Sequence, residues 1–172
     1  MNKFISIIAG LLLAGSSFAA SLSEDITAQG NVSFWHKTLT AQQLATMVSN
    51  YEVVTAANTI TYLECGSTFF LSSATEFAST LPTPIAGCGF KFIVDAAPVG
   101  TAYTIVTPAS ATIIDGTTVV NGGVIGCANE HTITFTASAA ISGDWVELVS
   151  DGTNWFVTGQ AFAATGIACT AA

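Results

Sequence analysis

The sequence predicts an all-β protein, an antiparallel β-sandwich or β-prism-like module preceded by one short N-terminal helix. Two observations predict this class. From Tyr51 onward the chain is dominated by Thr, Val, Ile and Phe, which favour strands. Gly, Pro, Asp and Asn interrupt these segments about every ten residues, a spacing typical of short strands joined by turns. The length of 172 residues suits a single domain.

The first nineteen residues have the pattern of an export signal. A short positive start at Met1-Asn2-Lys3 precedes an apolar run from Phe4 to Ala14. Small residues at Ser17 and Ala19 then form a cleavage site, so we expect residues 1–19 to be a signal peptide and Ala20 to be the mature N-terminus. The apolar run is shorter than the roughly 20 residues of a membrane helix. An uncleaved anchor is the alternative, but no stable membrane span is expected after cleavage.

Residues 20–50 form an N-terminal leader with one short helix. The segment 20–38 is polar and has little periodicity. Thr40 and Gln43 have the spacing of a capping box. Leu44 and Val48 then fall on one helical face, so the sequence predicts a helix over about 40–49.

The β module covers residues 51–172, and its strands are expected where β-branched and aromatic residues cluster or alternate with polar ones. In 89–95, for example, every second residue from Phe90 to Val94 is apolar and suited to a core. The tail 159–172 is small and apolar, and fits either a last edge strand or an arm. The expected strands are 51–55, 59–64, 68–72, 76–81, 89–95, 102–107, 111–114, 117–120, 131–137, 144–150 and 154–158.

Two Asp-Gly dipeptides predict hairpin turns. Asp115-Gly116 lies between the expected strands 111–114 and 117–120, and Asp151-Gly152 lies between 144–150 and 154–158. Asp-Gly between apolar runs favours a primed turn, in which glycine accepts a positive φ at little cost.

The four cysteines, Cys65, Cys88, Cys127 and Cys169, all lie in the expected mature chain. An even number in an exported protein predicts disulfides, and four cysteines allow three pairings, among which the sequence does not choose. Buried free thiols are one alternative. Bridges between chains are another, above all for Cys169 near the C-terminus.

Composition excludes several classes of function. Only 8% of the residues are charged, Lys plus Arg number 3 and the net charge is −8, so no basic surface exists for nucleic acid. No catalytic residues, metal or cofactor are expected. Glu130 and His131 are adjacent, and in a strand they would point to opposite faces. A calcium site from Asp115, Asp144 and Asp151 is a weaker reading, because turn formation already explains two of these residues.

Three aromatic residues, Tyr103, Trp145 and Trp155, form a candidate ligand platform, because aromatic faces stack on the apolar faces of sugars. The competing interpretation is that they belong to the core. In that case Trp145 and Trp155, on either side of one hairpin, would pack as a cross-strand pair.

Four strings in 51–160 stand out: Thr80-Leu81-Pro82, Phe90-x-Phe92-x-Val94, Ile114-Asp115-Gly116 and, most specific, Ser150-Asp151-Gly152-Thr153-Asn154-Trp155. Together they resemble a β module that recurs in the virion proteins of tailed phages, namely tail-fibre, neck-appendage and capsid-decoration proteins. The resemblance implies an all-β, non-catalytic building block that is often trimeric. This chain adds an export signal and four cysteines, which favour an exported relative at a cell surface or in an extracellular assembly.

Two functions follow as expectations. The first is an exported structural protein that self-assembles, as a homotrimer or a filament, into a surface, fibre or virion-like particle. Scarce charge and strand edges without Lys or Pro guards support it, because exposed apolar faces and open edges are usually covered by a partner. The alternative is a secreted module that binds surface glycans.

Overall fold

The computed structural model describes residues 31–34, 37–40, 51–73, 75 and 77–171. The chain divides into two compact units, Met1–Val48 and Ser49–Ala172. In the first unit, β1 (Asn31–Phe34) pairs antiparallel with β2 (Lys37–Thr40). This hairpin was not predicted, because two four-residue strands are too short to show a period. Thr40, the predicted helix cap, belongs to β2, and the rest of the predicted helix lies outside the described residues.

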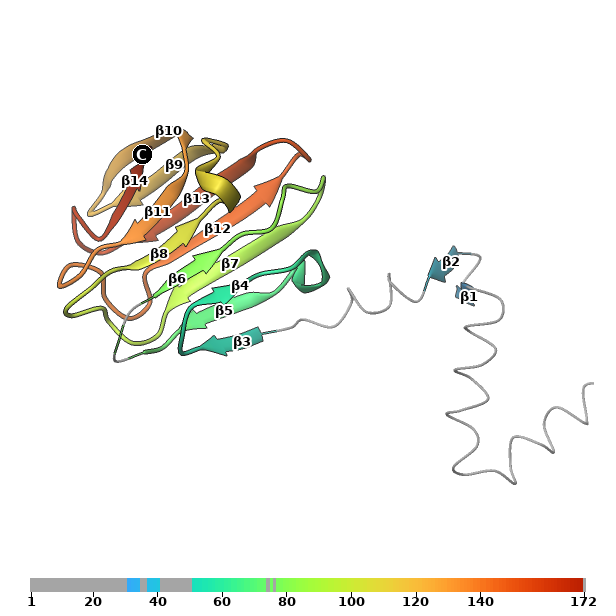
Figure 1. The fold of residues 1–172 in the computed structure, drawn as a ribbon, viewed down its shortest axis with the longest axis horizontal. Helices are drawn as coiled ribbons and strands as arrows, with labels where there is room; N and C mark the ends of the chain where they lie inside the picture. Colours follow the sequence, from blue (N-terminus) through green and yellow to red (C-terminus); the bar gives the residue numbers. More distant parts are fainter. Residues whose placement is uncertain (1–30, 35–36, 41–50, 74, 76, 172) are drawn as a thin grey trace, which may run out of the picture. The chain divides into compact units, whose positions relative to one another are not determined.

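The second unit is an all-β sandwich, which confirms the predicted class (Figure 1). One sheet has seven strands in the order β10-β9-β13-β12-β7-β5-β3, and the other has five in the order β14-β11-β8-β6-β4. The strands of the larger sheet are β3 (Tyr51–Val54), β5 (Thr68–Leu71), β7 (Gly89–Val94), β9 (Ile114–Val120), β10 (Gly123–Glu130), β12 (Trp145–Ser150) and β13 (Trp155–Ala161). Those of the smaller sheet are β4 (Asn58–Thr59), β6 (Ala78–Thr80), β8 (Tyr103–Val106), β11 (Thr132–Phe135) and β14 (Ile167–Thr170).

Both sheets are mixed, so the expectation of antiparallel pairing throughout was wrong. From β3 to β8 the chain alternates between the two sheets, strand by strand. Each strand therefore reaches its neighbour in the same sheet after crossing the other layer, and runs parallel to it. The parallel pairs are β3–β5, β5–β7, β4–β6, β6–β8 and, later in the chain, β9–β13.

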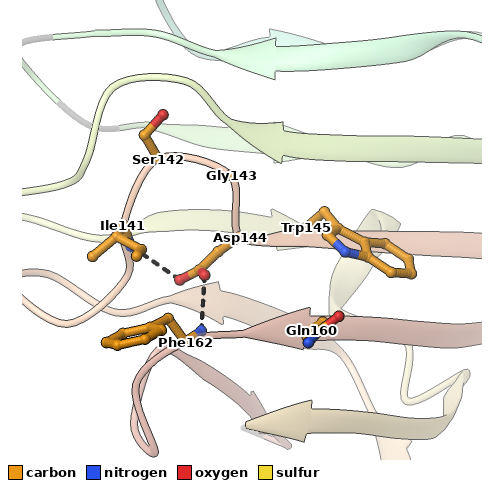
Figure 2. Close-up of a pocket in the computed structure, with 7 residues that line it drawn as sticks. All are labelled: Ile141, Ser142, Gly143, Asp144, Trp145, Gln160 and Phe162. Atoms are coloured by element: carbon orange, nitrogen blue, oxygen red, sulfur yellow. Dashed lines mark hydrogen bonds between the residues drawn. The ribbon is translucent and has the colours of Figure 1, made fainter. Parts of the chain in front are cut away.

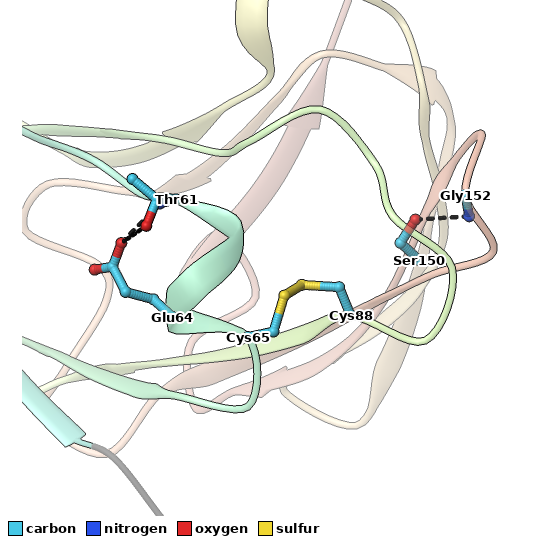
Figure 3. The surroundings of a disulfide bond; sticks show 6 residues. All are labelled: Thr61, Glu64, Cys65, Cys88, Ser150 and Gly152. Carbon is cyan, nitrogen blue, oxygen red and sulfur yellow. Dashed lines mark hydrogen bonds between the residues drawn. A yellow bond between two sulfur atoms is a disulfide. The ribbon is translucent and has the colours of Figure 1, made fainter. Parts of the chain in front are cut away.

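Two predicted strands, 59–64 and 111–114, were misplaced, and one strand of the sandwich was missed; of 111–114 only Ile114 lies in a strand, as the first residue of β9. The segment 59–64 contributes only Thr59 to β4, and Tyr62–Glu64 form the 3-10 helix η1. The cause is local: the backbone N–H and the hydroxyl of Thr61 both donate to the Glu64 carboxylate at 2.7 Å, which closes the turn (Figure 3). A second 3-10 helix, η2, covers Pro108–Ser110. Strand β10 was not predicted, because its glycines and Asn129 give a weak strand pattern.

The predicted turn at Asp115-Gly116 is wrong, because both residues lie inside the continuous strand β9. Gly116 has φ +137° and pairs with Val157 of β13. A Cβ at this position would press on the Val157 carbonyl oxygen and lie 2.9 Å from its backbone nitrogen. Glycine is therefore required here for a close approach of two backbones and not for a turn.

Asp151-Gly152, by contrast, does form a turn. The last pair of the hairpin is Ser150 with Trp155, so four residues make the loop. Asp151 Oδ1 accepts the backbone N–H groups of Thr153 and Asn154, both at 2.8 Å, and Gly152 has φ +102°. These two donors, Asn154 first, hold the pKa of Asp151 below that of an ordinary aspartate.

The core lies between the two sheets, and two disulfide bonds cross-link the chain around it. Strands alternate as predicted, so that Phe90, Phe92 and Val94 of β7 are all buried. All four cysteines are paired within the chain, as Cys65–Cys88 (Figure 3) and Cys127–Cys169. The second bridge joins edge strand β10 of one sheet to edge strand β14 of the other. The C-terminal tail thus contains an edge strand, one of the two predicted alternatives.

Candidate functional site

The outer face of the seven-stranded sheet carries side chains that do not contribute to the core. Alternate residues of each strand point away from the five-stranded sheet, and the register of the pairs aligns them in rows across the strands. Side chains in one row are direct neighbours, because adjacent strands lie about 4.8 Å apart.

One of these rows is almost entirely apolar and crosses all seven strands. We call it the apolar row. Its only polar member is Gln160, and it reaches both edges of the sheet, where Val53 is 51% and Val124 is 69% exposed. In order from β10 to β3 it consists of Val124, Val119, Gln160, Trp145, Ile93, Phe70 and Val53.

The adjacent row is polar and carries two opposite charges on neighbouring strands. Lys91 of β7 pairs in register with Glu147 of β12. The Lys91 ammonium lies 4.7 Å from the centroid of the Trp145 ring, a cation–π distance. Beyond these two charges the row is mainly threonine, and Tyr51 at its end meets Phe70 of the apolar row edge to face. The outer face thus combines an apolar band with a balanced pair of charges.

The outer face of the five-stranded sheet differs in chemistry. Across the described residues of its strands it carries six threonines, two alanines and one valine, with no charge and no aromatic ring. The two rows are Thr170, Thr132, Val106, Thr80, Thr59 and Ala168, Thr134, Thr104, Ala78. Its side chains are short, so it offers little apolar surface to a partner compared with the apolar row.

A shallow pocket of about 270 Å³ opens beside the middle of the apolar row, where β12 begins and β13 ends. Figure 2 shows Asp144 at its centre, with Ile141 and Phe162 on one side and Trp145 and Gln160 on the other. Phe162, just beyond β13, is 75% exposed. The lining residues are Ile141, Ser142, Gly143, Asp144, Trp145, Gln160 and Phe162.

Asp144 fixes the shape of this pocket. Its side chain is buried, and each carboxylate oxygen accepts one backbone N–H: Oδ2 from Ile141 at 3.0 Å and Oδ1 from Phe162 at 2.9 Å. These donors belong to two different loops, β11–β12 and β13–β14. The backbone of Asp144 also pairs with Val94, whose N–H donates to the Asp144 carbonyl at 2.9 Å. One carboxylate therefore ties two loops to the end of the sheet.

The candidate platform of three aromatic residues is wrong as a unit. Tyr103 and Trp155 are fully buried in the core, where the Tyr103 hydroxyl donates to the Ser73 carbonyl and Trp155 packs 5.5 Å from Phe90. Trp145 alone lies on the outer face. It also does not pair with Trp155: Trp145 is opposite Gln160, and Trp155 is opposite Ser150 at the other end of the hairpin.

The polar groups considered for chemistry are not brought together. Asp115 of β9 accepts the backbone N–H of Asn129 of β10. Asp144 binds the two loops of the pocket, and Asp151 closes its own turn. His131 Nδ1 lies 3.0 Å from the Thr170 carbonyl, in a different set of contacts. Among the described residues, no group of three or more His, Cys, Asp or Glu side chains could hold a metal ion. In the same part of the chain no helix has the length and apolar character needed to cross a membrane.

Comparison of the chain with protein-family models, with curated proteins and with solved structures gives no match. Its two disulfides are typical of proteins in an oxidising, extracellular-type compartment.

Sequence reasoning missed the apolar row and five of the seven pocket residues, namely Ile141, Ser142, Gly143, Gln160 and Phe162. The outward residues of each strand can be recognised by their period of two, as in Trp145, Glu147 and Val149 of β12. Their alignment across seven strands depends on strand order and register, for which the sequence carries no local signal. Phe162 gave no signal either, because it falls in the tail that was expected only as a strand or an arm.

Proposed function

We propose that this protein is a non-enzymatic, exported structural module that self-assembles through the outer face of its seven-stranded sheet. The apolar row carries the proposal. It is an exposed apolar band on a rigid sheet in a protein of few charges, and such bands usually mark a contact surface.

The size of the outer face fits a second copy of the chain. Seven strands at about 4.8 Å span roughly 29 Å, and five residues along a strand span about 17 Å. The accessible surface of such a face is of the same order as the roughly 800 Å² per partner buried in a specific contact. In addition, Lys91 and Glu147 provide charges of both signs, so two like faces can meet without net repulsion.

Export and a structural role are supported independently. The signal-peptide pattern of residues 1–19 and the two disulfides both suit a secreted or cell-surface protein. The resemblance to tailed-phage virion modules favours a trimer or a virion-like particle, and a filament is the other form of assembly. N-terminal sequencing of exported protein should give Ala20, and retention of Met1 would contradict export.

Light scattering coupled to size exclusion, at micromolar concentration, tests assembly. We expect a mass several times that of the mature chain, which is about 16 kDa after removal of the signal. Val53→Lys and Val119→Lys place a charge at two exposed positions of the apolar row and should shift the protein toward the monomer. Val99→Lys is the matched control, because Val99 is 74% exposed but lies in the β7–β8 loop, away from this face.

Two results would refute the proposal. A wild-type protein that is monomeric under these conditions has no assembly to explain. A wild-type oligomer whose mass is unchanged in both row variants would place the contact elsewhere.

A further inference from the structure

We propose that the pocket between Trp145 and Phe162 binds an uncharged sugar ring. This inference is separate from self-assembly and does not depend on it. It starts from the backbone of the pocket: Asp144 binds the N–H groups of Ile141 and Phe162, so the loops that carry these residues are held before any ligand arrives. Preorganisation of this kind lowers the entropic cost of binding.

The lining offers the contacts that a sugar ring uses. The highly exposed Phe162 and the face of Trp145 that Lys91 does not cover supply aromatic surface for the C–H groups of a pyranose. Gln160 lies next to Trp145 on the neighbouring strand, and its exposed amide can both donate to and accept from hydroxyl groups. Ser142 also lines the pocket, but its hydroxyl points away from Asp144 (Figure 2).

Size and charge narrow the class of ligand. The volume of about 270 Å³ lies just below the range of about 300–1,000 Å³ found for ligand pockets, so only a small ligand such as a single sugar ring fits. Asp144 is the only charged residue in the lining, and both of its oxygens already accept backbone N–H groups. The pocket therefore lacks an unengaged charge for an ionic ligand, and the net charge of −8 disfavours acidic sugars.

The pocket can be tested without disturbing the proposed assembly surface. Trp145 and Gln160 belong to both features, but Phe162 lies outside the apolar row. Phe162→Ala removes the exposed ring of the pocket while leaving its backbone N–H, the group that Asp144 uses. Phe156→Ala is the matched control for sugar binding, because Phe156 is the same residue type and is 46% exposed in β13 but does not line the pocket. Since Phe156 lies on the outer face of the seven-stranded sheet, only its sugar binding is compared and not its mass.

Saturation-transfer NMR observes the ligand. Because assembly through the apolar row would cover Trp145 and Gln160, the Val53→Lys variant is measured beside the wild type. We would test the mature chain against methyl glycosides of glucose, galactose, mannose and N-acetylglucosamine, with glucuronic acid as the charged counterpart. We expect at least one neutral sugar to receive saturation from aromatic protons. Phe162→Ala should weaken its binding about tenfold, and Phe156→Ala should bind as the wild type does.

Three results would overturn the proposal: no neutral sugar binds, glucuronic acid binds as well as glucose, or Phe162→Ala binds as tightly as Phe156→Ala. Light scattering of the same samples distinguishes failure of the sugar-site proposal from failure of the proposed self-assembly. Loss of sugar binding in Phe162→Ala with an unchanged mass leaves assembly standing, and a change in mass alone says nothing in favour of a sugar site.

Discussion

Replacing Asp144 should destabilise the protein more than its single side chain suggests, because two loops depend on its carboxylate. In Asp144→Ala the N–H groups of Ile141 and Phe162 lose their acceptors in a partly buried position. A buried donor left without a partner costs about 1–3 kcal/mol. Since water reaches part of this site, we expect Asp144→Ala to lower the free energy of unfolding by about 2–4 kcal/mol.

Asp144→Asn is the informative second variant. The amide oxygen can keep one of the two bonds, but the NH₂ group then faces the other N–H donor. The expected loss is intermediate, about 1–3 kcal/mol. Urea unfolding with both disulfides intact measures these differences, at one protein concentration because self-association raises apparent stability.

Hydrogen exchange gives a second and local measurement. The amides of Ile141 and Phe162 should exchange faster in both variants, whereas those of β7 next to β12 should change only with global stability. If the free energy of unfolding of Asp144→Ala lies within about 0.5 kcal/mol of the wild-type value, a difference typical of neutral surface substitutions, then the carboxylate does not hold these loops.

Three further predictions concern the core, the bridges and the turn. Joint replacement of Cys127 and Cys169 by Ser should cost about 4 kcal/mol, as expected for a bridge across 42 residues, and thiol counting on unfolded, unreduced wild type should find none. Thr118→Val should stabilise the protein by about 1 kcal/mol in urea unfolding, because the buried Thr118 hydroxyl has no partner among the described residues; a loss of stability would mean that it has one. NMR titration should give Asp151 a pKa below that of an ordinary aspartate. The stability that the Asp151 carboxylate contributes is therefore present above the pKa of the unfolded state and is lost as the pH falls through the lower pKa of the folded state. A normal pKa would argue against the two backbone hydrogen bonds of Asp151.

The two Asp-Gly dipeptides separate what the sequence determines from what tertiary structure decides. Asp151-Gly152 forms its turn through bonds to Thr153 and Asn154, all within four residues, so local chemistry was sufficient. Asp115-Gly116 has the same two residues between similar neighbours, yet it lies within a strand. What differs is the approach of Val157, about forty residues away, which no local pattern contains.

By itself the sequence determined the all-β class, most strand positions and the inward residues of strands such as β7, because the alternation of side chains in a strand is a local property. It allowed three cysteine pairings, and only the fold brought Cys127 to Cys169 and Cys65 to Cys88. It also could not separate the buried Trp155 from the outward Trp145. Strand order, parallel pairing and the apolar row were decided by the way the chain alternates between two sheets, which places residues side by side that are far apart in sequence.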